Sequence, residues 1–215
     1  MIRALHTLSL FIPAVLLIVL AGPRFFTGLA LEEVYPVPDG IVTNRYFAPA
    51  TYADAASFLS LTDAADGDSQ ATRAAALWHS GEHVVPIGPI LVAALSRSPS
   101  SIQGWVLLAE SLETADRKRA ATALSVGLEL SPFDYWLVGR KARAAAVLWS
   151  DLDSDARQQA TAQAAMLWTE EDLRPQIVPL VSVKGGAALL TRAITDPDQI
   201  RAINRYISKV RLGLP

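Results

Sequence analysis

Three side chains that can bind zinc lie close together in the sequence, at His79, Glu82 and His83. The order H-x-x-E-H is found in one class of metalloproteases, where two histidines of a helix hold the metal and the glutamate acts as the base. Such a site needs both histidines on one unbroken helix. Gly81 interrupts this segment and favours a left-handed turn. We therefore expect Trp78 to close a helix and both histidines to lie in a solvated turn.

Acidic side chains at Asp151, Asp153 and Asp155 alternate as they do at the start of a calcium-binding loop. The position where such a loop needs glycine is Ala156, and the position where it needs a bidentate glutamate is Ala162. The pattern is therefore incomplete. We expect these acids to cap the helix that follows and to interact favourably with its dipole.

A hydrolytic enzyme of the cell envelope that uses Glu110, Glu113 or the pair His79 and His83 is the alternative with an active site. The acidic segment 169–173 is interpreted as the first turn of a helix, because consecutive carboxylates do not converge on one substrate bond. No catalytic, metal-ligating or cofactor-binding residue is predicted. The chain is accordingly not expected to be an enzyme.

The N-terminal segment predicts a membrane anchor. Residues 4–22 carry no formal charge and approach the ~20 apolar residues that a helix needs to cross a bilayer. Arg3 precedes this stretch and acidic residues follow it from Glu32 on, which favours a cytoplasmic N-terminus and an exported remainder. We predict a single-pass anchor over 1–30 in a bacterial inner membrane, with the C-terminal domain in the periplasm. Signal-peptide cleavage and a buried soluble helix are the alternatives.

After the anchor, three prolines and an Asp-Gly pair mark residues 31–50 as an extended linker. The remaining segment, 51–215, is rich in alanine and leucine and has recurring helix-start signals, so we predict one all-α domain. The expected N-caps are Thr51, Ser131, Thr169 and Asp196. The expected helices are 52–65, 69–80, 87–98, 102–114, 117–130, 133–149, 154–168, 173–183, 186–195 and 197–210.

Internal repetition indicates how these helices are arranged. Leu-Trp closes three of the helical segments, at Trp78, Trp149 and Trp168. Pro99 and Pro132 are separated by nearly the ~34-residue period of tetratricopeptide repeats, although the next comparable proline comes too late to continue it. Residues at the spacing of that repeat's two helices are Trp105, Leu108, Ala109, Leu112, Ala120 and Leu124. This stretch resembles a tetratricopeptide unit, which implies a short solenoid of antiparallel helix pairs.

Two tryptophans and three basic residues are the candidate binding residues. The tryptophans are expected mainly to pack between helices, and an aromatic platform for a sugar or a peptide is the alternative for Trp105 and Trp136. In the last helix Arg201, Arg205 and Lys209 recur every fourth residue. They lie beside an apolar stripe that consists of Ile200, Ile203, Ile207 and Val210. This basic face is either solvated or in contact with an anionic lipid or polymer.

Composition and a second resemblance restrict the possible classes of function. The formal net charge of −2 argues against a nucleic-acid partner, and the absence of cysteine excludes disulfides. The apolar N-terminus and the segments 131–160 and 185–206 together resemble small membrane-anchored helical proteins of bacterial exopolysaccharide or O-antigen assembly. That resemblance implies a non-enzymatic accessory protein that binds an envelope protein complex or a glycan. A general envelope scaffold unrelated to polysaccharide is the alternative.

Overall fold

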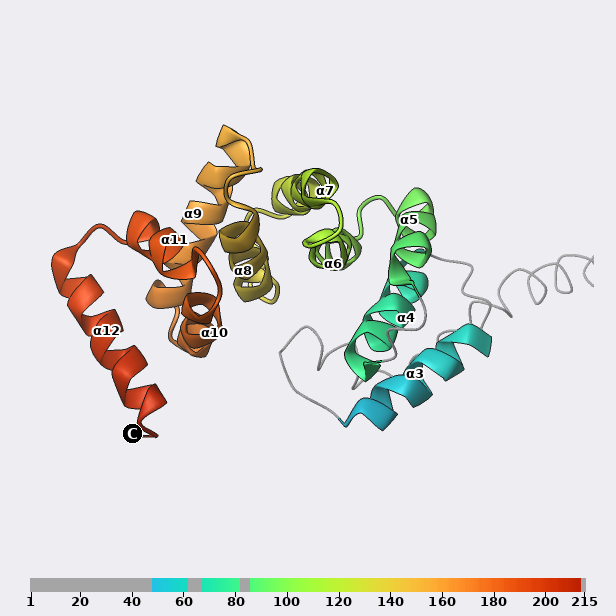
Figure 1. Ribbon diagram of the computed structural model, residues 1–215, viewed down its shortest axis with the longest axis horizontal. Coiled ribbons are helices and arrows are strands. Elements are labelled where there is room, and N and C mark those ends of the chain that lie inside the picture. Colours follow the sequence, from blue (N-terminus) through green and yellow to red (C-terminus); the bar gives the residue numbers. More distant parts are fainter. Residues whose placement is uncertain (1–47, 62–66, 82–85, 214–215) are drawn as a thin grey trace, which may run out of the picture. The chain divides into compact units, whose positions relative to one another are not determined.

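The computed structural model describes residues 48–61, 67–81 and 86–213, and every regular element in these ranges is a helix (Figure 1). The predicted all-α fold class is confirmed for the described residues. The helices belong to two compact units, divided between Val85 and Pro86. Their bounds are α3 Pro49–Leu61 and α4 Gly67–Ser80 in the first unit, and α5 Ile87–Arg97, α6 Ile102–Leu112, α7 Arg117–Leu130, α8 Val138–Leu148, α9 Ser154–Thr169, the 3₁₀ helix η1 Glu171–Gln176, α10 Ile177–Ser182, α11 Gly186–Ala193 and α12 Pro197–Arg211 in the second.

None of the described helices has the length and apolar character that crossing a membrane requires. The anchor predicted over 1–30 lies outside the described residues and stays a prediction. Most of the linker predicted over 31–50 lies outside them as well. Its last two residues already belong to α3, which begins at Pro49. Proline suits the first position of a helix, because its φ is helical and the missing N–H group has no partner to lose there.

The first unit is a pair of helices with alanine-rich faces. Ala55, Ala56 and Leu59 of α3 are buried, as are Ala74 and Ala75 of α4, and the two helices pack on each other. Small side chains at a helix contact reduce the distance between the helix axes. In the described part of this unit, alanines therefore make up much of the buried apolar surface, together with Tyr52, Leu59 and Leu77.

In the second unit, helices pack on their neighbours in the chain and on the helix after that. α5 packs on α6, α6 on α7, α7 on α8 and α8 on α9, while α6 also touches α8 and α7 also touches α9. This pattern of neighbours is typical of stacked helix pairs. After α9 the order changes, because α10 and α11 return to pack on α8. The all-helical, repeat-like arrangement is compatible with the predicted solenoid.

The contact between α6 and α7 shows why this pair packs closely. Ala109, Ala120 and Leu124, which carry part of the resemblance to a tetratricopeptide unit, are fully buried. Gly127 of α7 faces α6, and a β-carbon there would lie 3.4 Å from the Cβ of Trp105. A β-carbon at Gly127 would thus already be in van der Waals contact with α6, and the two helices lie side by side (Figure 1).

Helix starts were predicted less well than helix positions. Only Asp196 of the four predicted N-caps is confirmed, since its carboxylate accepts a hydrogen bond of 2.8 Å from the backbone N–H of Asp198. Thr51 and Thr169 lie inside α3 and α9, and Ser131 ends α7 instead of starting the next helix. The caps at Thr51 and Thr169 are wrong because a helix extends over each residue, and the cap at Ser131 is wrong because a turn separates this residue from α8.

Two predicted helices are also shorter than expected. The segment 133–149 becomes a turn followed by α8, which begins only at Val138. The segment 173–183 is divided into η1 and α10, with Pro175 inside the 3₁₀ helix. Proline cannot donate the backbone hydrogen bond that a continuous α-helix requires.

A glycine pair fixes the turn before α11. Gly185 has a φ of +87°, which favours glycine, and a β-carbon there would lie 2.5 Å from the carbonyl oxygen of Ala146 in α8. A β-carbon on Gly186 would overlap the carbonyl oxygen of Leu180 in α10. Both glycines are therefore needed for α11 to pack where it does.

Candidate functional site

The structure gives the histidine motif a packing role at its first residue. His79 lies in the last turn of α4, and Gly81 follows it with a φ of +76°, which confirms the predicted left-handed turn. The ring of His79 stacks on Tyr52 with the ring centroids 5.3 Å apart, so His79 is half-buried in a helix and the expected solvated turn is wrong for it. Glu82 and His83 lie outside the described residues. Within the described residues, no group of three potential ligands is placed to hold a metal ion.

The three aspartates of the calcium-like pattern have separate structural roles. Asp151 accepts hydrogen bonds from Nε and Nη2 of Arg117, at 3.0 and 2.8 Å, and these bonds are the main reason that the pKa of Asp151 lies below its usual value. Asp153 accepts a hydrogen bond of 2.8 Å from the backbone N–H of Ala156 and is the N-cap of α9, as predicted. Asp155 lies in the first turn of the same helix.

A buried ion pair joins α6 to α8. Nε of Arg140 donates to Oε1 of Glu110 at 3.1 Å, and Nη2 donates to Oε2. The two side chains are only 9% and 11% exposed. Burial acts to lower the pKa of Arg140, but the charge and hydrogen bonds of Glu110 outweigh it and raise the pKa above its usual value. The carboxylate of Glu110 is thus already held by a guanidinium group.

Glu113, the second glutamate considered for a hydrolase active site, is half-buried near this ion pair. Burial raises the pKa of Glu113, and the negative charge of Glu110 adds to the effect, while Arg143 and Arg117 act in the opposite direction. Its buried Oε1 accepts no hydrogen bond from the described residues. Glu113 is therefore a carboxyl group whose charged form is poorly compensated.

Two buried polar side chains hold the turn between α7 and α8. Nζ of the fully buried Lys141 donates to the carbonyl oxygen of Ser131 at 2.7 Å, and Nε2 of Gln163 donates to that of Pro132 at 3.0 Å. Burial lowers the pKa of Lys141, with Asp134 opposing the shift. Two carbonyl groups of this turn are therefore satisfied by buried side chains of other helices.

Trp136, one of the predicted binding residues, lies on this projecting turn. Phe133 is 75% exposed and Trp136 is 59% exposed. The ring of Tyr135 meets that of Trp136 edge-on at 5.5 Å, and its hydroxyl donates to Asp172 at 3.4 Å. Trp136 is accordingly an exposed aromatic side chain, whereas a packing role between helices was expected for most of the tryptophans.

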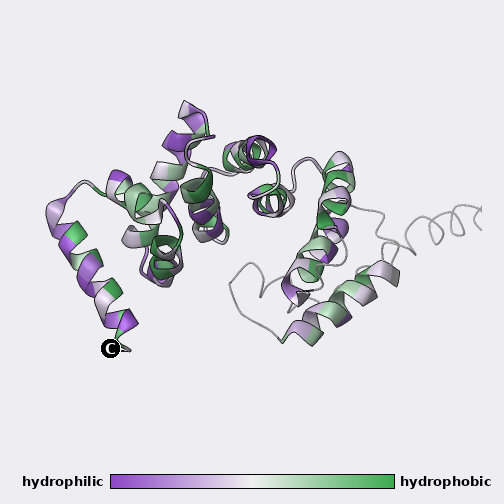
Figure 2. Ribbon diagram, viewed as in Figure 1, coloured by the Kyte–Doolittle hydropathy of each residue, from purple (hydrophilic) through white to green (hydrophobic). Residues whose placement is uncertain are grey.

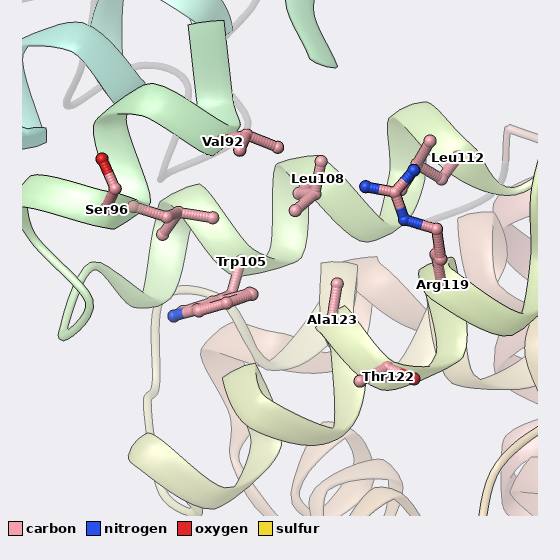
Figure 3. A pocket seen from close by; sticks show the side chains of 9 residues that line it. Val92, Ser96, Trp105, Leu108, Leu112, Arg119, Thr122 and Ala123 are labelled. Carbon is pink, nitrogen blue, oxygen red and sulfur yellow. The ribbon is translucent and has the colours of Figure 1, made fainter. Parts of the chain in front are cut away.

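Trp105, the other predicted tryptophan, forms part of an apolar groove between α5, α6 and α7 (Figure 3). The groove has a volume of about 390 Å³. Nε1 of Trp105 donates to the carbonyl oxygen of Pro99 at 2.8 Å. This hydrogen bond fixes the position of the ring in the lining of the groove. Val92 is 48% exposed, so an apolar side chain of the groove meets solvent. The lining residues are Val92, Leu95, Ser96, Trp105, Leu108, Leu112, Arg119, Thr122 and Ala123.

The three predicted basic residues all lie exposed on α12. Arg201 forms an ion pair with Asp198 one turn earlier, and Arg205 and Lys209 follow along the helix. Hydrophilic and hydrophobic residues alternate along this helix (Figure 2). Ile203 of the predicted apolar stripe is buried, whereas Val210 is 44% exposed. The apolar stripe of α12 is therefore only partly buried.

The sequence did not reveal that an arginine lies on each of two helix-closing tryptophans. Nε of Arg157 donates to the carbonyl oxygen of Trp149 at 3.0 Å, and Nε of Arg174 donates to that of Trp168 at 3.2 Å. The guanidinium carbons lie 5.8 and 4.9 Å from the ring centroids. Arginine here satisfies a helix C-terminus and contacts the aromatic ring at once. The only signal in the sequence was the repeated Leu-Trp.

The predicted binding residues thus occupy three places, the groove, the α7–α8 turn and α12. Only the three basic residues share one helix. Comparison of the chain with protein-family models, curated proteins and solved structures found no match. The function is therefore inferred from the sequence and from the surfaces described above.

Proposed function

We propose that this chain is a non-enzymatic, tetratricopeptide-like accessory protein that binds a protein partner in the groove between α5, α6 and α7. The N-terminal segment would anchor it in a bacterial inner membrane with the helical units in the periplasm. Its partner would belong to a complex that assembles or exports cell-envelope polysaccharide. The observation that carries the binding role is the apolar groove itself, which is open to solvent in a stack of helix pairs.

The chemistry of the groove defines the segment that would fit. Leucine, valine and alanine side chains and the Trp105 ring make up most of its lining, and Arg119 contributes a guanidinium group at one end (Figure 3). A partner segment with apolar side chains and a flanking carboxylate would match both features. Tryptophan and arginine are among the residues on which binding energy concentrates at interfaces, and the groove contains Trp105 and Arg119.

The anchor would raise the effective concentration of the groove near membrane enzymes. This part of the proposal is supported by the uncharged segment 4–22 and by the charges on either side of it. The polysaccharide context is supported by the resemblance of segments 131–160 and 185–206. Finding the intact protein free in the cytoplasm would contradict the anchor.

The test is crosslinking and affinity purification of the full-length tagged protein from its own membranes, followed by mass spectrometry. Val92→Arg places a charge in the groove, and Val210→Arg is the matched control, because the two valines are 48% and 44% exposed. We expect the wild type and Val210→Arg to recover polysaccharide polymerase, ligase or export components. Val92→Arg should lose them.

Other outcomes separate the alternatives. Equal recovery with Val92→Arg would refute the groove as the binding site. Recovery of unrelated envelope proteins that depends on Val92 would favour the general scaffold and remove the polysaccharide assignment.

A further inference from the structure

A second hollow lies in the unit that holds the groove, between α9 and α11. It has a volume of about 410 Å³ and is broadly open. Trp149, at the end of α8, contributes its ring, and Arg157 and Arg192 each lie on it, with guanidinium carbons 5.8 and 4.9 Å from the ring centroid. Two positively charged side chains thus contact the same tryptophan ring.

The two arginines differ in what holds them. Arg157 donates through Nε to the carbonyl oxygen of Trp149 and through Nη2 to that of Ser150, at 3.0 and 3.2 Å. Arg192 is exposed and is held only by the ring in the contacts found among the described residues. Neither guanidinium group forms an ion pair with a carboxylate of the described residues, in contrast to Arg117 and Arg140.

A guanidinium group that lies on an aromatic ring keeps its N–H groups directed outward in its own plane. Those donors match the two oxygens of a carboxylate. Arg157 lines the same hollow and adds a second positive charge, whose position is set by two backbone carbonyl groups. The hollow is therefore suited to a carboxylate that approaches from solvent.

The rest of the lining indicates what carries the carboxylate. Gln158 contributes an amide and Thr161 a hydroxyl group that donates to the carbonyl oxygen of Arg157 and can still accept, and Ala162 and Ala165 contribute apolar side chains. Hydroxyl groups of a sugar ring can bond to the former, and its C–H face can rest on the latter. A broadly open hollow admits a unit within a polymer, and the Trp149 ring, on which a nucleobase would have to stack, is already in contact with both arginines.

We propose that the Trp149 hollow binds a carboxylate-bearing sugar unit of an acidic polysaccharide, with Arg192 donating to the carboxylate and Arg157 supplying the second charge. This site is separate from the α5–α7 groove, and it can be tested without the protein partner. The glycan would enter the hollow from solvent, between α9 and α11.

The experiment is calorimetric titration of the full-length protein in detergent with oligomers of galacturonate and of mannuronate. The methyl-esterified oligomers are the matched ligand control, because they have the same sugar rings without the negative charge. Arg192→Gln removes the free guanidinium group, and Arg143→Gln makes the same change at an exposed position of α8 that does not line the hollow. Oligoglutamate and a single-stranded oligonucleotide test the other polyanions.

We expect binding of at least one acidic oligomer, loss of binding on esterification, and binding at least about tenfold weaker in Arg192→Gln, since a hydrogen bond between charged groups is lost. Arg143→Gln should bind like the wild type. The proposal is overturned by failure of both acidic oligomers to bind, by equal binding of the esters, or by an effect of Arg143→Gln but not of Arg192→Gln. It is also overturned if oligoglutamate or the oligonucleotide binds as tightly as the sugars.

Discussion

The buried ion pair between α6 and α8 provides the sharpest test of how this structure is held together. Glu110→Gln keeps the size of the side chain and one oxygen acceptor, but it leaves the guanidinium group of Arg140 buried without a countercharge. Removing one partner of a buried pair costs about 3–5 kcal/mol. Because the amide still accepts one hydrogen bond, we expect a loss near the lower end, about 3 kcal/mol.

The matched control is Glu129→Gln, the same change at an exposed position of α7. Exposed substitutions usually alter stability by less than about 0.5 kcal/mol. Urea unfolding of the full-length protein, followed by far-UV circular dichroism, compares the two variants. With a urea dependence of about 1–3 kcal/mol per molar, the midpoint of Glu110→Gln should fall by roughly 1–3 M relative to the control.

A second variant distinguishes the lost countercharge from general damage to the core. In Glu110→Leu with Arg140→Met both charges are replaced by apolar side chains, and such replacements are often neutral or stabilising. The double variant should therefore be more stable than Glu110→Leu alone. If Glu110→Gln unfolds at the same urea concentration as Glu129→Gln, the pair is not buried in solution and the reasoning is refuted.

Three further predictions concern other parts of the fold. Gly186→Ala should lower the free energy of unfolding by about 1–3 kcal/mol and lower the melting temperature accordingly, because the added carbon meets the carbonyl oxygen of Leu180. An unchanged melting temperature would contradict the packing of α11. Asp116→Ala should lose about 1 kcal/mol in urea unfolding, because its carboxylate accepts the backbone N–H of Arg119 at the start of α7. The raised pKa of Glu113 means that the folded state binds its proton more tightly than the unfolded state. Stability should therefore fall as the pH rises from the ordinary value of 4.5 through the raised pKa, and Glu113→Gln should lose this dependence when urea midpoints are compared across the range.

Helix positions were accessible from the sequence because they depend on local patterns. The predicted segment 117–130 coincides with α7, and the prediction 186–195 differs from α11 by two residues at its end. Apolar spacing, glycine and proline act within a few residues and do not need the rest of the chain. Capping failed at Ser131, where the turn is held by Lys141 and Gln163 from other helices, and no local pattern contains that information.

The sequence alone determined that the described part of the chain is helical, that Asp196 and Pro197 begin its last helix, and that Gly81 follows a helix in a left-handed turn. These properties follow from backbone propensities and nearby side chains. Only the tertiary structure decided which side chains meet. It paired Glu110 with Arg140, formed the groove around Trp105 and placed Arg192 on Trp149. Each of these contacts joins different helices, and their meeting depends on how whole helices pack, which the spacing of residues along the chain does not specify.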